Sequence, residues 1–257
     1  VLDKNGLKMS KRLGNAADPF ETLRKYGPDA TRWYMITNAE PWDNLKFNLD
    51  GITEVQRKFF GTLYNTYGFF AMYANIDQFD GSEDKIPVAD RPEIDQWVMS
   101  KLNSLIVEVD THFAEYEPKK AGRAIQEFVT EHLSNWYVRL CRRRFWKGEL
   151  SSDKYAAYQT LYTCLETVAQ LISPIAPFYS ERLFMDINKV TKRAEGSVHL
   201  SYFPKSATQL IDTDLEQRME IAQTVTSLVL SIRKKEKLRV RQPLQKIMVP
   251  VRNDTFH

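Results

Sequence analysis

The chain has 257 residues, of which 43% are hydrophobic and 12% aromatic, so it is long enough to bury one large core or two smaller ones. No run approaches the roughly 18 uninterrupted apolar residues that a membrane span requires, and two cysteines are too few for a disulfide framework or a four-cysteine zinc site. The net charge of +3 is too small to indicate a polyanionic partner by itself, although basic residues gather at 139–147 and 233–241. We therefore expect a soluble cytoplasmic protein without a metal site or a membrane partner, and the start at Val1 suggests a fragment.

The first helix is predicted to begin after residue 18. Asp18 is a suitable N-cap, Pro19 suits the first helical position, and Glu21 is placed to bond back to the cap. Gly27 is expected to end this helix and Pro28 to begin another. Residues 1–45 are thus predicted to form loops and short helices.

Apolar residues then recur at three- and four-residue spacing along several segments, which predicts long amphipathic helices. Alternation at 198–202 and an apolar run at 247–251 predict a small strand element near the C-terminus, and 78–91 is expected to be a surface loop. The predicted fold is mainly α, with a helical bundle over 46–205 and a helix and strand over 206–257. We predict helices over 52–71, 94–113, 118–146, 155–172 with a continuation to 186, and 214–235.

The helix that begins at Pro118 is predicted to have two different faces. At about 100° per residue, Val129, Leu133, Trp136 and Leu140 share an apolar face. Guanidinium groups match phosphates, and arginine and tryptophan stack on unpaired bases, so the other face suits RNA, with a solvated charged surface as the alternative. That other face carries Asn135, Arg139, Arg142, Arg143 and Trp146.

Neighbouring residues are expected to have structural roles. Arg144 falls on the apolar side of the same helix, where a buried ion pair is expected. Trp136 and Tyr137 are expected to pack in the core. The same is expected of the aromatic side chains between residues 59 and 70, namely Phe59, Phe60, Tyr64, Tyr67, Phe69 and Phe70.

The opening stretch GLKMSKRLGN, residues 6–15, places basic side chains on a loop between two glycines. Lysine ammonium groups on such a loop can neutralise a phosphate chain, whereas the alternative is a solvated charged turn. Lys8-Met9-Ser10-Lys11-Arg12-Leu13-Gly14-Asn15, followed by Asp18-Pro19, resembles the KMSKS signature of class I aminoacyl-tRNA synthetases.

Further strings extend this resemblance to the isoleucyl branch of that family. The stretch NWYVRLCRRRFW at 135–146 is similar to the anticodon-domain helix of isoleucyl enzymes, and RKKEKLRVRQPL at 233–244 continues the similarity. Valyl relatives usually carry an acidic residue near the place where Arg139 stands. Arg12 departs from the serine of the signature and resembles the eukaryotic-type branch, which also occurs in some bacteria.

The resemblance implies an ATP-dependent ligase that activates isoleucine and transfers it to tRNA(Ile). It implies that Lys8 and Lys11 stabilise charge on the ATP phosphates as catalytic groups, with Lys11 the direct ATP contact, while Ser10 belongs to the same ATP-contacting loop and chiefly shapes it. ATP would be accompanied by Mg in the full-length enzyme. The implied tRNA-binding residues are Asn135, Arg139, Arg142, Arg143 and Trp146.

The resemblance also divides the chain. Residues 1–45 would be the end of the catalytic domain with stem-contact helices, 46–205 an anticodon-binding domain, and 206–257 a lead into a further domain. A "HIGH"-like element and room for an editing domain are absent, so we expect no activation by this chain alone. The alternatives are a valyl or leucyl relative, a free-standing helical RNA-binding module, and a protein-interaction scaffold.

Overall fold

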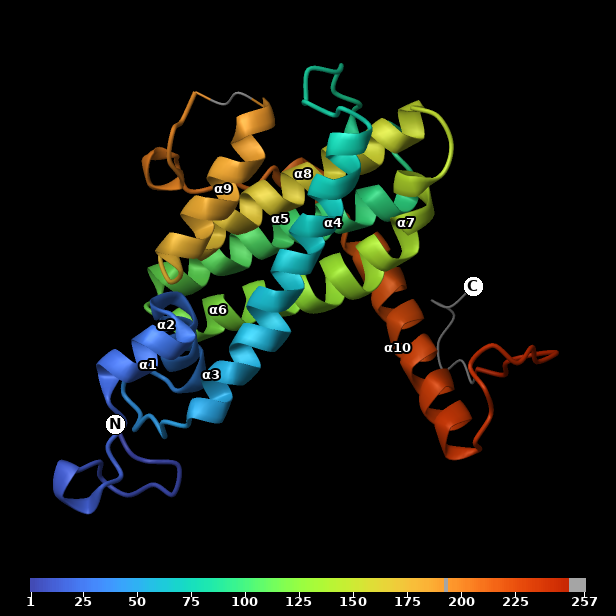
Figure 1. The fold of residues 1–257 in the computed structure, drawn as a ribbon. Helices are drawn as coiled ribbons and strands as arrows, with labels where there is room; N and C mark the ends of the chain where they lie inside the picture. The colour runs from blue at the N-terminus through green and yellow to red at the C-terminus, as the bar shows by residue number, and fades with distance from the viewer. Residues whose placement is uncertain (192–193, 250–257) are drawn as a thin grey trace. The chain divides into compact units, whose positions relative to one another are not determined.

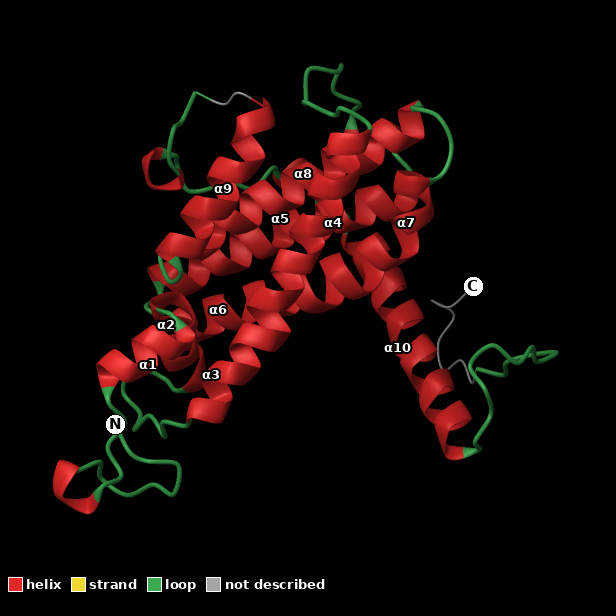
Figure 2. Cartoon of the chain, viewed as in Figure 1, coloured by secondary structure: helices red, strands yellow, loops and turns green. Residues whose placement is uncertain are grey.

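The computed structural model describes residues 1–191 and 194–249 (Figure 1). The chain separates into two compact units, which divide between Ile211 and Asp212. Figure 2 shows helices joined by loops, and β-structure among the described residues is confined to isolated bridges from Leu2 to Lys8 and to Lys46. The prediction of a mainly α fold is therefore confirmed.

The N-terminal part begins with short helices at the predicted positions. The Asp18 side chain accepts a hydrogen bond from the Glu21 N–H at 2.9 Å, and Pro19 occupies the first turn. Gly27 ends this helix with a φ of 81°, a conformation that glycine adopts without steric cost, and Pro28 follows. The elements are η1 (Lys11–Leu13), α1 (Pro19–Tyr26) and α2 (Pro28–Asn38).

Long helices build the rest of the first unit. The central helix α8 contacts α4, α5, α6, α7 and α9, and the side chains of Leu161, Leu165 and Val168 are fully buried. Burial of these apolar side chains is the main stabilising term of the bundle. The elements are α3 (Leu49–Val55), π-helical η2 (Gln56–Phe60), α4 (Gly61–Ile76), α5 (Glu93–Ala114), α6 (Pro118–Glu127), π-helical η4 (Phe128–Val138), α7 (Arg139–Trp146), α8 (Ser152–Ile172) and α9 (Pro177–Thr191).

The predicted apolar face of the helix from Pro118 is wrong beyond Leu133. Leu140 is 56% exposed and Trp136 is half-buried, whereas Tyr137 and Cys141 are buried. The reason is the π-helical segment η4, whose i→i+5 hydrogen bonds place more than four residues in each turn. The buried stripe therefore keeps a spacing of four residues, at 125, 129, 133, 137, 141 and 145.

The strand predictions near the C-terminus are also wrong within the described residues. Val198–Leu200 is a 3-10 turn, because the Ser197 hydroxyl accepts a hydrogen bond from the His199 N–H and Glu181 holds the Val198 N–H at 2.9 Å. Residues 247–249 form no strand, and residues 250 and 251 lie outside the described part.

Two local expectations need a smaller correction. Among the aromatic side chains of 59–70, Phe59, Phe60 and Phe70 are buried as expected, but Tyr64 is 63% exposed. The surface loop over 78–91 includes the short 3-10 helix η3 (Val88–Asp90), and it buries Arg91 at its end.

The second unit consists of α10 (Thr213–Lys235) and the segment that follows it. Asp212 caps this helix by accepting a hydrogen bond from the Leu215 N–H at 2.9 Å. Arg233 at its end supports the turn beyond by donating to the carbonyls of Arg239 and Gln242. Cations at this end also complement the helix dipole.

Candidate nucleic-acid interface and phosphate loop

The exposed side of the helix η4–α7 carries the residues predicted to contact RNA. We call Asn135, Arg139, Arg142, Arg143 and Trp146 the arginine face; all five are exposed. The three guanidinium groups make no hydrogen bond or ion pair with another described residue, while the Asn135 amide donates to Glu131 Oε2 at 3.1 Å. Unpaired guanidinium forks beside an exposed indole are available for phosphates and bases.

Arg144 has the opposite environment, as predicted. Its guanidinium makes two 2.7 Å hydrogen bonds to the fully buried carboxylate of Asp95 and lies 2.9 Å from Asp153. The hydroxyl of the buried Tyr137 donates to the same Asp95 carboxylate at 2.7 Å. Burial alone would lower the pKa of Arg144, but the hydrogen bonds to Asp95 raise it above the ordinary value.

This ion pair fixes the direction of the arginine face. Arg144 lies on α7, Asp95 on α5, and Asp153 at the start of α8, so the inner side of α7 is held by two other helices. Bidentate arginine–carboxylate pairs restrict geometry strongly. The outer side of the helix is consequently presented to solvent in one orientation.

A second basic feature is the loop over residues 8–14, which we call the phosphate loop. Lys8, Lys11 and Arg12 are exposed on it, and their side chains have no ion-pair partner among the described residues. The Ser10 hydroxyl accepts a hydrogen bond from the Arg12 N–H at 3.2 Å and caps the 3-10 turn, which ends at Gly14 with a φ of 67°. Ser10 thus shapes the loop, as expected.

Two residues beside this loop were missed by the sequence reasoning. The Asn15 side chain contacts both the loop backbone and the Asp3 carboxylate, at 2.8 and 2.9 Å. The hydrogen bond from Asn15, followed by those from backbone N–H groups, holds the pKa of Asp3 below its ordinary value. An asparagine directly after a loop glycine was the available signal, because a short amide side chain can bind a neighbouring backbone.

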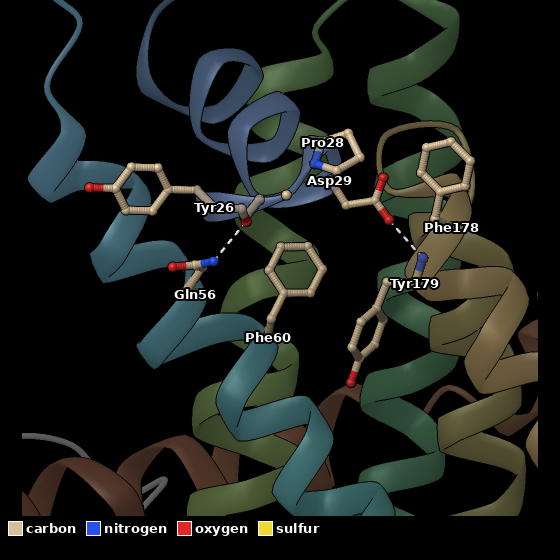
Figure 3. A pocket seen from close by; sticks show the side chains of 9 residues that line it. Tyr26, Pro28, Asp29, Gln56, Phe60, Phe178 and Tyr179 are labelled. Carbon is tan, nitrogen blue, oxygen red and sulfur yellow. Dashed lines mark hydrogen bonds between the residues drawn. The ribbon is translucent and has the colours of Figure 1, made fainter. Parts of the chain in front are cut away.

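A further hollow in the first unit lies between the α1–α2 junction, η2 and the start of α9 (Figure 3). Its volume is about 360 Å³. Two of its polar side chains are already engaged: Gln56 donates to the Tyr26 carbonyl at 2.7 Å, and Asp29 accepts from the Tyr179 N–H at 2.6 Å. The rest of the lining is largely aromatic, so we assign no chemistry to it.

Residues 1–191 and 194–249 contain neither of two further classes of site. No group of three or more histidine, cysteine, aspartate or glutamate side chains in these ranges is arranged to hold a metal ion. No helix in the same ranges is long and apolar enough to cross a membrane.

Comparison with protein families identifies the class. Residues 95–248, more than half of the chain, match the family described as "Anticodon-binding domain of tRNA ligase", and residues 1–48 match "tRNA synthetases class I (I, L, M and V)". The chain therefore belongs to the family of tRNA ligase anticodon-binding domains.

Similar curated proteins include isoleucine–tRNA ligases. That of Cytophaga hutchinsonii is 65% identical over 98% of this chain, and that of Bacteroides thetaiotaomicron is 63% identical over 99%. The chain spans only 23% and 22% of their lengths. Because these relatives are bacterial, they give no support to the eukaryotic-type branch inferred from Arg12.

Solved structures show the same fold at low sequence identity. The ternary complex of the Agrobacterium radiobacter K84 agnB2 LeuRS with tRNA and LeuAMS matches 82% of this chain and 23% of that chain, with a TM-score of 0.61 and 18% identity. The Mycobacterium tuberculosis methionyl-tRNA synthetase with methionyl-adenylate matches 70% of this chain and 35% of that chain, with a TM-score of 0.57 and 23% identity.

Proposed function

We propose that this chain is the part of an isoleucine–tRNA ligase that binds the anticodon region of tRNA(Ile) and carries the loop that contacts ATP. The observation that carries the proposal is the arginine face: three unpaired guanidinium groups lie on one firmly held helix, within the segment that matches the anticodon-binding family. The isoleucine–tRNA ligases at 65% and 63% identity support the choice of amino acid.

Each member of the arginine face has a role in this proposal. Arg139, Arg142 and Arg143 bind backbone phosphates or stack on splayed anticodon bases, since a planar guanidinium can do both. Trp146, which is 55% exposed, offers an aromatic surface for a base, and Asn135 offers an amide for a base edge.

The phosphate loop serves the activation step. The isoleucine carboxylate attacks the α-phosphate of ATP and displaces pyrophosphate, and the activated acyl group then passes to the end of the tRNA. Lys8 and Lys11 stabilise the negative charge that grows on the phosphate oxygens, with Lys11 as the direct contact and Ser10 holding the turn. Mg accompanies ATP in the full-length enzyme, and this chain alone is expected to be inactive.

The proposal assigns 1–45 to the end of the catalytic domain, 46–205 to the anticodon-binding domain, and 206–257 to the lead into a further domain. It also places the ligase in the cytoplasm, because Cys141 and Cys164 are free thiols buried within helices, in keeping with a reducing compartment.

The first test is a titration of the chain with three RNAs: tRNA(Ile), the same tRNA with a changed anticodon, and tRNA(Val), each at two salt concentrations. We expect the native anticodon to bind most tightly. Arg139→Ala or Arg143→Ala should weaken binding about 5- to 100-fold and reduce the salt dependence by about one phosphate contact each. Arg182→Ala is the matched control, because Arg182 is an exposed arginine on α9 that pairs with Asp186 at 2.8 Å.

The other outcomes separate the alternatives. Tighter binding of tRNA(Val), or of a leucine tRNA added as a fourth probe, would favour a valyl or leucyl relative. Equal binding of all RNAs with strong salt dependence would indicate a general RNA-binding module. No binding at either salt concentration would contradict the proposal and favour a protein-interaction scaffold.

A further inference from the structure

We propose that Asp3 and Asn15 are positioning residues that hold the phosphate loop in the conformation in which Lys8 and Lys11 meet the phosphates. The consequence for ATP rests on the proposed function, whereas the order of the loop can be tested without it. The two residues lie outside the lysine-bearing string, one before the loop and one directly after it.

The Asn15 side chain closes the loop on itself. Its Oδ1 accepts a hydrogen bond from the Ser10 N–H at 2.8 Å, and its Nδ2 donates to Asp3 Oδ2 at 2.9 Å and to the Lys8 carbonyl at 3.3 Å. A single amide thus binds the backbone on both sides of Met9, in the stretch that separates Lys8 from Lys11. This arrangement fixes where both lysine side chains leave the main chain.

Asp3 is the second residue of this arrangement, which we call the Asp3–Asn15 tether. Its Oδ1 accepts hydrogen bonds from the N–H groups of Asn5 and Leu7, both at 2.9 Å, and its own N–H donates to the Leu7 carbonyl at 2.8 Å. The residue is only 8% exposed. Its carboxylate therefore binds both the segment before the loop and the Asn15 amide after the loop.

The tether is anchored to the helical unit. Next to Asp3, the Leu2 N–H donates to the Leu45 carbonyl and the Leu2 carbonyl accepts from the Phe47 N–H, both at 2.8 Å. The hydroxyl of Tyr34, buried on α2, holds the same segment by donating to the Lys46 carbonyl and accepting from the Asn48 N–H, both at 3.0 Å. A continuous series of hydrogen bonds runs from the core to the loop.

Such a tether favours phosphate binding because it reduces the conformational entropy that the loop loses when it binds. An untethered loop between Gly6 and Gly14 samples many conformations and must lose them when its lysines are positioned. A loop already held in one conformation loses fewer conformations, so a larger share of the lysine–phosphate attraction contributes to the binding free energy. The geometry requires a donor at residue 15 and an acceptor at residue 3.

The test exploits this donor and acceptor pair. Asn15→Asp keeps the size and the acceptor for the Ser10 N–H but turns a carboxylate oxygen toward Asp3, so the two repel each other. We expect trypsin to cleave after Lys8, Lys11 and Arg12 about tenfold faster than in the unmodified chain. Combining it with Asp3→Asn restores one donor and one acceptor between residues 3 and 15, although not the hydrogen bond to the Lys8 carbonyl, and should return cleavage most of the way to the original rate.

Asn5→Asp is the matched control, because it adds the same charge to the same segment at a residue that joins the tether only through its backbone N–H. Thermal unfolding of each variant should be unchanged, which separates loosening of the loop from unfolding of the chain. Unchanged cleavage in Asn15→Asp would overturn the tether. Cleavage of the double variant as fast as that of Asn15→Asp would overturn the pairing of the two residues.

The consequence for ATP is measured in a Cytophaga hutchinsonii ligase whose matching segment is replaced by this chain. We expect Asn15→Asp to lower kcat/KM for ATP in pyrophosphate exchange about tenfold, to leave KM for isoleucine unchanged, and to be rescued by Asp3→Asn. Unchanged exchange despite a loosened loop would overturn the positioning role. Unchanged exchange in Lys11→Ala would contradict the proposed function instead and leave the proteolysis result standing.

Discussion

Arg143 and Arg144 are neighbours in the chain with opposite environments. Arg143 is exposed and has no ion-pair partner among the described residues, whereas the Arg144 side chain is 16% exposed and pairs with two carboxylates. One step along a helix turns a side chain by about 100°, which is enough to move it from solvent to the helix interface. Residues that look equivalent in a basic cluster can therefore have separate roles.

The Arg144–Asp95 pair supports a prediction about stability. Arg144→Leu leaves Asp95 as a buried carboxylate without its cation, and we expect a loss of about 3–5 kcal/mol in the free energy of unfolding. Adding Asp95→Leu removes the second charge and should recover part of that loss. Urea denaturation of both variants is the measurement, and a double variant less stable than the single one would contradict the prediction.

For single residues, structural roles were easier to predict from the sequence than bonding partners. The helical position of Arg144 predicted a structural ion pair, but Asp95 and Asp153 could not be predicted, because the first lies 49 residues away in the chain and the contact depends on how α5 packs against α7. Asn15 was overlooked because its contacts follow from the path of the loop, which the sequence pattern alone does not define.

At the scale of elements, helix starts were well predicted and helix phase was not. Asp18, Pro19 and Gly27 act through local geometry, so the sequence sufficed. The buried stripe after Leu133 required knowledge of the π-helical segment η4, which changes the number of residues per turn. All five members of the arginine face are nevertheless exposed, as the sequence pattern predicted.

Packing between elements gives a prediction at Gly122 on α6. A Cβ there would lie 2.6 Å from Thr37 Cγ2 on α2 and 3.6 Å from Ile175 Cδ1, so Gly122→Ala should push α6 away from α2 and cost about 1–3 kcal/mol. Gly68→Ala on α4 is the matched control: nothing lies within 4 Å of its Cβ, and the change should stabilise the helix by up to about 1 kcal/mol.

Thermal and urea unfolding of the two glycine variants should therefore shift in opposite directions. If Gly122→Ala were as stable as Gly68→Ala, the close contact between α2 and α6 would not be a requirement of the fold.

At the scale of the whole molecule, the two units differ in their buried cores. The buried apolar side chains of the described residues lie before Ile211, with Leu215 as the exception. The first unit thus contains its own hydrophobic core, which is the main requirement for independent folding. The expected boundaries at 45–46 and 205–206 stay predictions.

This distribution predicts that a chain ending at Ile211 folds on its own. We expect a single cooperative thermal transition, and a far-ultraviolet circular dichroism spectrum that loses only the contribution of the removed helix α10. A chain of residues 212–257 measured in parallel should show no cooperative transition. Loss of cooperative unfolding in the shortened first unit would contradict the prediction.

The π-helical segment also constrains how this region can vary among related genes. An ordinary α-helix with one residue fewer would keep the same buried face, because three residues of α-helix, at about 100° each, turn nearly as far as four residues of the wider π-helix. Deleting one codon within 128–138 should therefore remove π-helical turns while Tyr137 and Cys141 still face the core, and replacements at exposed positions such as Glu131 should also leave that face unchanged. An inserted codon would instead turn every following residue by about 100°, so in this stretch the loss of one residue should be better tolerated than the gain of one.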